Sequence, residues 1–324
     1  MEQATSVIAW GNRLDHFLAR VGVRRTGGHL VKPGLYALGR PTPDSPVFVT
    51  ANYTLSFDAL RSALADRDAY ILVLNTRGIN VWCAAGKGTF GDGEIATRVR
   101  ATSLEQVVSH RVLILPQLGA AGVSAEEVKR RTGFDVRYGP VRAADLPEYL
   151  KTGQATPEMR RVRFSLADRL VLIPIELVHA ILPTAAVAGL LWLTGAKLAA
   201  WAVVAAVLAG TALFPFLLPW IPTRDFSTKG FVLGGLATLP FATAAVSGGG
   251  ALWLRLLSAL AYLLALPPVT AFLALNFTGA TTFTSRTGVK REIATYIPVM
   301  AWLAGTGLVA AAATVVARWV VGTP

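Results

Sequence analysis

The chain has 324 residues, a formal net charge of +12, a hydrophobic fraction of 53% and one cysteine. A single cysteine excludes a disulfide framework, a cysteine-rich zinc site and an iron–sulfur cluster held by this chain alone, which would take about four thiolates. Charged residues dominate before about Arg169 and long apolar runs dominate after it. We therefore predict two domains, a soluble domain over residues 1–159 and a transmembrane domain over residues 160–324.

The soluble domain is expected to begin with an amphipathic helix over residues 9–21, followed by a loop rich in proline and glycine over residues 33–46. No apolar segment typical of a cleavable signal peptide occurs in residues 1–40. Short apolar runs then predict strands at 47–50, 70–74, 111–115 and 135–138, with helices at 56–66, 94–100 and 124–132. The last helix has Ser124 as its N-cap and Glu127 at the capping-box position. This alternation predicts an α/β Rossmann-like domain with a mostly parallel sheet.

In such a sheet, ligands bind at the carboxyl ends of the strands. Each predicted strand ends in a turn that mixes small residues with amide or hydroxyl groups, which suits a ligand with a polar fringe. The candidate contacts there are Thr50, Asn52, Asn75, Gln117, Gly119 and Gly139. Ordinary turns without a ligand are the alternative interpretation.

The cysteine lies in residues 80–90, NVWCAAGKGTF, directly after the second predicted strand. Cys83 stands between the indole of Trp82 and a run of small residues that leaves space for a flat ligand. Asn80 is placed to cap a short helix and direct Cys83 outward. A lone cysteine is more often a small buried hydrophobe, and that alternative stays open on the residues alone.

Residues 80–87 resemble the cap-helix motif of the mercury-methylating corrinoid proteins, Asn-Val/Ile-Trp-Cys-Ala-Ala/Gly-Gly-Lys, without a gap. Residues 46–60 and 113–123 are similar to the corrinoid domain shared with the large subunit of the corrinoid iron–sulfur protein. The resemblance covers most of residues 30–150. The chain departs from the family at Asp92, where a threonine is expected.

The resemblance implies a cobalamin bound without its own base, with Cys83 as the lower axial ligand of the cobalt. A thiolate is a soft, charged ligand and suits that position. Lys87 offers a positive charge near the thiolate, unless it is an ordinary solvated lysine. The cofactor contacts implied in the cap are Asn80, Val81, Trp82, Cys83, Ala84, Ala85, Gly86 and Lys87. The chain does not contain the Asp-x-His-x-x-Gly signature by which other cobalamin proteins supply histidine.

The implied activity is a methyltransferase that converts inorganic Hg(II) to methylmercury. Hg(II) is an electrophile, so it takes the methyl group as a carbanion or radical. The implied partners are a ferredoxin with two four-iron clusters as reductant and a methyl donor linked to methyltetrahydrofolate. The basic residues form no stripe interleaved with aromatics, so we expect no nucleic acid as a partner.

Five apolar runs predict transmembrane helices at about 170–193, 198–221, 230–246, 252–276 and 296–321, and the third is short. Lysines and arginines at 160–169, 224–229 and 286–291 fall on one side, whereas the opposite loops carry little beyond Lys197 and Arg255. We therefore predict a multi-pass protein of the cell (inner) membrane, in contact with lipid, whose soluble domain is cytoplasmic. Glu176 and His179 share one helical face near the cytoplasmic end, as a functional pair or as residues facing the headgroups.

Two other functions remain open on the sequence. The first is a membrane-anchored corrinoid methyl carrier of one-carbon metabolism with a different native acceptor, because a cysteine ligand specifies the chemistry more firmly than the substrate. The second is a membrane transporter with a cofactor-sensing soluble domain. Charged residues within the spans are few, which disfavours the transporter.

Overall fold

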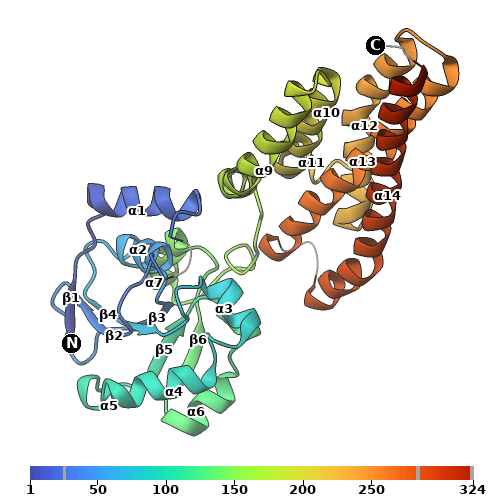
Figure 1. Cartoon of the computed structure of the whole chain (residues 1–324). Coiled ribbons are helices and arrows are strands. Elements are labelled where there is room, and N and C mark those ends of the chain that lie inside the picture. The colour runs from blue at the N-terminus through green and yellow to red at the C-terminus, as the bar shows by residue number, and fades with distance from the viewer. Residues whose placement is uncertain (25–26, 282–284, 322–324) are drawn as a thin grey trace. The chain divides into compact units, whose positions relative to one another are not determined.

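The computed structural model describes residues 1–24, 27–281 and 285–321. The chain divides into two compact units, Met1–Arg163 and Phe164–Pro324, and each is described by itself. The first unit is a mixed α/β domain and the second is helical (Figure 1).

A sheet of six strands forms the centre of the N-terminal unit, in the order β1-β2-β4-β3-β5-β6. Its strands are β1 (Glu2–Ala4), β2 (Gly34–Leu38), β3 (Val47–Ala51), β4 (Ala69–Leu74), β5 (Val112–Leu115) and β6 (Asp135–Tyr138). Strands β4, β3, β5 and β6 are mutually parallel, which confirms the four predicted strands and their parallel arrangement. Strand β2 runs antiparallel to β4, so the complete sheet is mixed.

Strands β1 and β2 are additions to the predicted fold, and the prediction of a loop over 33–46 is wrong at its start. The sequence of β2, GLYAL, pairs along its whole length with β4, and Leu35–Leu38 are buried. Pro33 precedes this strand and Gly39 follows it, so the sequence around β2 resembles that of a turn. Pro33 lies outside the strand and therefore interrupts none of its hydrogen bonds.

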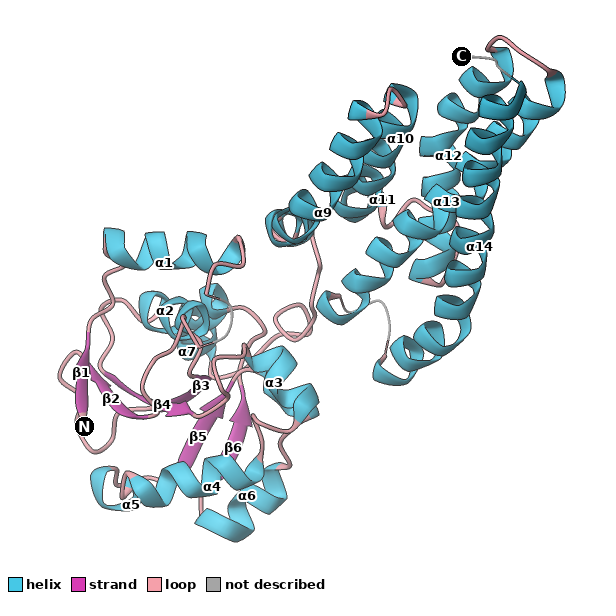
Figure 2. Ribbon diagram, viewed as in Figure 1, coloured by secondary structure: helices cyan, strands magenta, loops and turns pink. Residues whose placement is uncertain are grey.

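Helices cover both faces of the sheet. They are α1 (Trp10–Arg20), α2 (Thr54–Ala63), α3 (Val81–Lys87), α4 (Asp92–Ala101), α5 (Leu104–Val107), α6 (Ala125–Thr132) and α7 (Leu146–Thr152), with 3₁₀ turns at Gln117–Ala121 and Ala143–Asp145. Figure 2 shows α1, α2 and α7 on one side of the sheet and α4, α5 and α6 on the other. Each side has its own hydrophobic core, because both faces of the parallel strands are buried.

Helix α6 begins as predicted but is capped differently at its first turn. The Ser124 hydroxyl accepts a hydrogen bond from the Glu127 N–H at 3.4 Å, as an N-cap does. The Glu127 carboxylate does not return to the Ser124 N–H, because it pairs with Arg130 and Arg131. The Ser124 N–H instead donates to Asp92 at 2.8 Å, so Asp92 links the starts of α4 and α6. The predicted capping box is therefore wrong.

In the described residues of the C-terminal unit, five helical segments are long and apolar enough to cross a membrane. Its helices are α8 (Leu166–Leu170), α9 (Ile173–Leu193), α10 (Lys197–Leu208), α11 (Phe214–Leu217), α12 (Phe226–Ser247), α13 (Leu252–Asn276) and α14 (Arg286–Val321), with a π-helical turn at Ala209–Leu213 and a 3₁₀ turn at Phe277–Ala280. The segments agree with the five predicted ones in order, with two differences. Helix α14 begins at Arg286 and not at 296, so Lys290 and Arg291 lie in a helix and are not loop charges. The third segment is not short, because α12 has 22 residues. A helix of that length rises about 33 Å, enough to cross the hydrocarbon core.

Two basic residues assigned to the flanks of these segments prove to be buried. Lys229 lies inside α12 and donates to the carbonyl of Ile221, so it is not a loop charge. Arg169 donates to the carbonyls of Pro215 and Phe216, which lie at the proline-broken end of the second segment. Both cations donate to backbone carbonyls, which reduces the cost of burying them.

The pair Glu176 and His179 lies in the first two turns of α9. His179 is exposed and its Nδ1 donates to the carbonyl of Ile175 within the same helix. This contact uses one imidazole nitrogen of His179 within its own helix. The side chain of Arg286 lies outside the described residues.

Candidate functional site

The segment around Cys83 folds as a short, strongly capped helix. The Asn80 side chain accepts a hydrogen bond from the Cys83 N–H at 2.9 Å, as predicted for an N-cap. At the other end, Gly88 has φ +80°, and the Thr89 and Phe90 N–H groups both donate to the carbonyl of Ala84. Caps at both ends stabilise a helix that is too short to be stable alone.

Helix α3 has one face in the core and one face outside. Val81, Ala84 and Ala85 are buried in the core on the α4 side of the sheet. Their side chains therefore pack against the protein, and the space we expected them to leave for a ligand is filled by the fold. The outer face carries Trp82, Cys83, Gly86 and Lys87. Trp82 is 38% exposed, and Cys83 is half-buried between the two faces.

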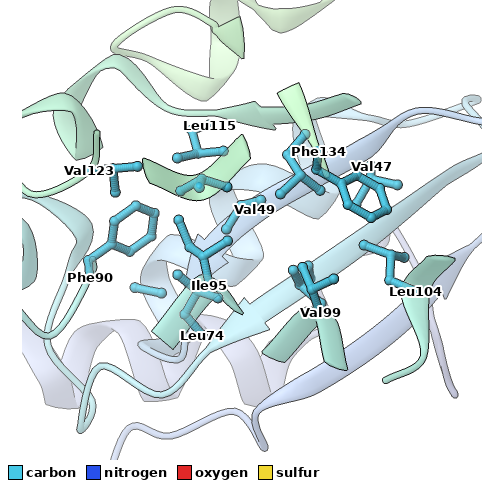
Figure 3. Close-up of a cluster of buried hydrophobic side chains, with 14 of the residues drawn as sticks. Val47, Val49, Leu74, Phe90, Ile95, Val99, Leu104, Leu115, Val123 and Phe134 are labelled. Carbon is cyan, nitrogen blue, oxygen red and sulfur yellow. The ribbon is translucent and has the colours of Figure 1, made fainter. Parts of the chain in front are cut away.

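Phe90 anchors the end of this segment. Its ring is fully buried beside Val123 and Leu115, as Figure 3 shows. Gly119 leaves room for the ring, because a Cβ added there would lie 2.6 Å from Phe90 Cε1. Gly119 is thus a packing residue beneath the cap, and its predicted contact with the cofactor stays a prediction.

Gly122 allows the cap to lie close to the turn after β5. A Cβ at this position would lie 2.5 Å from the Phe90 carbonyl oxygen and 2.7 Å from that of Ala85. We expect Gly122→Ala to destabilise the cap by about 1–3 kcal/mol, since backbone atoms must move apart. Gly86→Ala is the control, because nothing lies within 4 Å of a Cβ there and alanine favours a helix by up to about 1 kcal/mol.

Hydrogen exchange of the 80–90 amides in the full chain measures this effect. Faster exchange in Gly122→Ala and unchanged or slower exchange in Gly86→Ala are expected. Equal exchange in both variants would show that the close approach at Gly122 does not hold α3 in place.

The predicted strand-end residues meet at one edge of the sheet. The register pairs Ala51 with Leu74 and Leu115 with Tyr138, so the residues that follow each of them emerge together. Strand β3 has β4 on one side and β5 on the other, which is a topological switch point. Ligands of open α/β sheets bind at such points. Helix α3 packs on the 3₁₀ turn after β5, at the same edge (Figure 2).

Asn52 organises the loop between β4 and α3. It is buried, and its side-chain oxygen accepts hydrogen bonds from the Thr76 N–H (2.9 Å), the Thr76 hydroxyl (2.9 Å) and the Gly78 N–H (3.0 Å). The single hydroxyl proton of Thr76 is shared between this oxygen and the carbonyl of Ile79, which lies 2.7 Å away, immediately before the cap. This oxygen therefore positions the cap. Direct contact of Asn52 with a ligand stays a prediction.

Asn52→Ala is expected to loosen this loop, because the Thr76 and Gly78 N–H groups lose their acceptor, whereas the Thr76 hydroxyl keeps the carbonyl of Ile79. The expected loss is about 2–4 kcal/mol of local stability. Asn75→Ala, at an exposed strand end, should cost less than about 1 kcal/mol. Hydrogen exchange of residues 75–80 distinguishes the two variants, and an Asn52→Ala loop that is as protected as the parent's would contradict the role of the buried amide.

The other strand-end residues differ in exposure. Thr50 and Gly139 are buried, Gln117 is half-buried and Asn75 is exposed. The Gly139 N–H donates to the carbonyl of Leu115 at 2.8 Å, and Gln117 accepts from Arg160 at 3.3 Å. Asn75 and Gln117 thus carry the accessible polar groups of this edge.

Two supporting residues were missed by the sequence analysis. Glu94 accepts from the Asn75 N–H at 2.8 Å and pairs with Arg98, which ties α4 to the end of β4. Tyr138 donates to the carbonyl of Val123 at 2.7 Å and holds the loop beneath Phe90. Burial, followed by the charge of Asp92, raises the pKa of Tyr138, so it keeps its donor proton. The sequence feature that could have identified Glu94 is an acidic residue in the first turn of a helix that follows a strand end.

Most basic residues on the helices near this edge are paired with acids. Arg98 pairs with Glu94, Lys129 with Asp135, and Arg130 and Arg131 with Glu127. Among the described residues, no group of three or more His, Cys, Asp or Glu side chains is arranged to hold a metal ion. In this part of the chain, Cys83 stands alone as a soft donor.

Comparison with known proteins supports a specific class for the N-terminal unit. Residues 28–150 match the family described as CO dehydrogenase/acetyl-CoA synthase delta subunit. The acetyl-CoA decarbonylase/synthase complex subunit gamma of Methanopyrus kandleri is 37% identical over 123 residues, which are 37% of this chain and 26% of that protein. The same subunit of Archaeoglobus fulgidus is 33% identical, with the same shares covered.

The corrinoid/iron-sulfur protein large subunit of Moorella thermoacetica is 27% identical over 128 residues, 39% of this chain and 28% of that protein. The chain thus spans about a quarter of the length of the curated relatives it matches. The family match begins after α1 and ends within α7. Strands β2 to β6, the cap helix and the strand-end edge lie within the matched residues and are therefore similar to a domain of the CO dehydrogenase/acetyl-CoA synthase delta subunit family.

Proposed function

We propose that the N-terminal unit is a Rossmann-like corrinoid-binding domain in which Cys83 is the lower axial ligand of the cobalt. We further propose that the five apolar helices anchor it in the cell membrane with this unit on the cytoplasmic side. The complete chain is then a corrinoid-dependent methyltransferase that converts inorganic Hg(II) to methylmercury. The observation that carries the proposal is the position of Cys83, on a capped helix at the strand-end edge, in a domain similar to subunits that include a corrinoid protein.

The residues of this edge fit a corrinoid. Gly86 and Gly88 would have nothing within 4 Å of a Cβ added to either of them, so a large ring can approach the helix there. Asn75 and Gln117 offer amide groups to the polar fringe of the ring. The exposed Trp82 ring offers an apolar surface beside the thiol. When bound, the corrinoid supplies the methyl group that is transferred.

The chain's own residues prepare the thiol for this role. Asn80 fixes the first turn of α3 through the Cys83 N–H, and Phe90 and Gly122 fix its far end. A ligand held by a rigid support stays in one orientation, which is the usual function of the residues behind a metal ligand. With a corrinoid bound, the Cys83 thiolate would supply electron density to the metal, which is the chemistry that favours transfer of a methyl group as a carbanion equivalent. Hg(II), as a soft electrophile, accepts that group.

A second candidate function is a membrane-anchored corrinoid methyl carrier of one-carbon metabolism. It is favoured by the relatives, which are named as subunits of an acetyl-CoA decarbonylase/synthase complex. Both functions give Cys83 and the corrinoid the same roles, and they differ only in the molecule that accepts the methyl group. Both also require an external electron donor, for which we propose a ferredoxin with two four-iron clusters, and a methyl donor linked to methyltetrahydrofolate.

The acceptor is tested with the full chain in detergent, loaded with methylcobalamin and mixed with Hg(II). About one equivalent of methylmercury per loaded chain supports the mercury methyltransferase. Free methylcobalamin at the same concentration measures the uncatalysed background. A methyl group that stays on the protein with Hg(II), but moves to acetyl-CoA synthase, would replace the first function by the carrier.

A further inference from the structure

Helix α1 exposes an apolar face, whereas a surface helix ordinarily exposes its polar face. Its large exposed apolar residues are Trp10, Leu14 and Phe17, which are 78%, 47% and 60% exposed. Their spacing of four and three residues places them on one side of the helix. Amphipathic helices of soluble domains turn such a stripe toward the core. The apolar face of α1 therefore lacks a cover within the N-terminal unit.

Two polar residues of α1, Asp15 and His16, face the protein. His16 is hydrogen-bonded to Asp58 of α2 at 2.8 Å, and the buried Arg61 binds the same carboxylate at 2.6 Å. Asp15 accepts from the Thr54 hydroxyl at 2.6 Å and is hydrogen-bonded to His29 at 2.7 Å. These contacts fix the rotation of α1 about its axis, so the outward direction of the apolar stripe is built into the fold.

Positively charged side chains lie beside the exposed apolar stripe. Arg13 and Arg20 lie beside it and are exposed, and Arg24 follows just after the helix. The acidic residue of α1, Asp15, points inward to the contacts with Thr54 and His29. An apolar stripe with tryptophan and arginine at its margin has the composition of a helix that lies in the interface of a bilayer with anionic lipids.

The connection to the C-terminal unit is short. Met159 is buried in the core of the N-terminal unit, and Phe164 packs against the core of the C-terminal unit. The four residues 160–163 between them span at most about 18 Å when fully extended. A bilayer around the C-terminal unit is then present at a high effective concentration for the N-terminal unit.

We propose that α1 is an interfacial helix, and that its face formed by Trp10, Leu14 and Phe17 binds the surface of the bilayer. Arg13, Arg20 and Arg24 contact the lipid phosphates. This inference rests on the proposed membrane anchoring but not on the corrinoid or the methyl acceptor. Because the family match begins at residue 28, it concerns a part of the chain that the comparison does not cover.

Spin labels on the full chain in phosphatidylcholine/phosphatidylglycerol vesicles test the inference. Cys83→Ala removes the native thiol, and Leu14→Cys or Phe17→Cys then introduces one labelled position. The matched control is Glu126→Cys, on an exposed position of α6 across the sheet. We expect the labels at 14 and 17 to collide several-fold more with oxygen and less with a water-soluble nickel complex than the label at 126.

Two further variants show what holds the helix. Trp10→Glu should change the oxygen and nickel accessibilities of the label at 17 to those of the label at 126. The double variant Arg13→Glu with Arg20→Glu should change them part of the way, and only in vesicles that contain phosphatidylglycerol. Nickel accessibility at 14 and 17 equal to that at 126 would overturn the proposal. Protection from both reagents that increases with the protein-to-lipid ratio would also overturn it, because the face would then contact a second copy.

The anchoring is checked separately by extraction with alkaline carbonate. A chain that resists extraction while its labels stay accessible to nickel would refute the interfacial helix alone. A chain that is extracted would refute the anchoring, and the inference with it.

Discussion

Cys83→Ala should abolish methyl transfer to Hg(II) and leave the N-terminal unit folded. The variant removes the soft donor, whereas the cap is kept because the Asn80 side chain binds a backbone N–H and not the thiol. Alanine favours a helix and Cys83 is only half-buried, so the expected loss of stability is about 1 kcal/mol or less. Methylmercury formed by loaded protein, measured beside hydrogen exchange of residues 80–90, separates loss of the ligand from loss of the fold.

Cys83→His and Trp82→Phe are the comparison variants. Histidine restores a metal ligand but is a weaker electron donor than a thiolate, so methylation of Hg(II) should stay low while the corrinoid is retained. Trp82→Phe keeps an aromatic surface and should retain most of the activity. If Cys83→Ala forms methylmercury as fast as the parent, Cys83 is not the ligand.

Loaded protein without a reductant should transfer about one methyl group per chain and stop. A methyl group that leaves as a carbanion takes both bonding electrons, so two electrons and a new methyl group must be supplied before the next transfer. The chain has one cysteine, which we assign to the cobalt, and a four-iron cluster takes about four thiolates. Rapid mixing with excess Hg(II) should show a burst of methylmercury with the amplitude of one turnover.

Addition of a reduced ferredoxin together with a methyl donor should restart formation, and either one alone should not. Salt should slow the restart only moderately. Arg98 and Lys129 each pair with one acidic neighbour, and Arg130 and Arg131 share Glu127, which weakens their attraction for an acidic ferredoxin. Many turnovers without a reductant would exclude the carbanion route.

The parallel strands were predictable because their signal is local. Val47–Ala51 and Ala69–Leu74 are continuous apolar runs followed by turn residues, and every residue in them is buried. Strand β2 could not be found in this way, since its five residues become a strand only by pairing with β4, more than thirty positions along the chain. The start of α12 was missed because Ser227, Thr228 and Lys229 are polar but continue the helix.

The candidate site was predictable in its position and less so in its details. Asn80 was found because an asparagine before a helix has a specific capping geometry. The inward direction of Ala84 and Ala85 and the occupied oxygen of Asn52 were not, because both depend on which elements pack over them. The outward stripe of α1 is the clearest case: its periodicity indicated an amphipathic helix, but only the contacts of Asp15 and His16 show which face is exposed.

The most direct test of the central claim is X-ray absorption at the cobalt edge of the full chain loaded with cobalamin. The account predicts a sulfur neighbour of the cobalt in the parent, without the nitrogen of the cofactor's own base, and loss of that sulfur in Cys83→Ala. A parent whose cobalt has nitrogen as its axial neighbour, or a spectrum that is the same in Cys83→Ala, would contradict it.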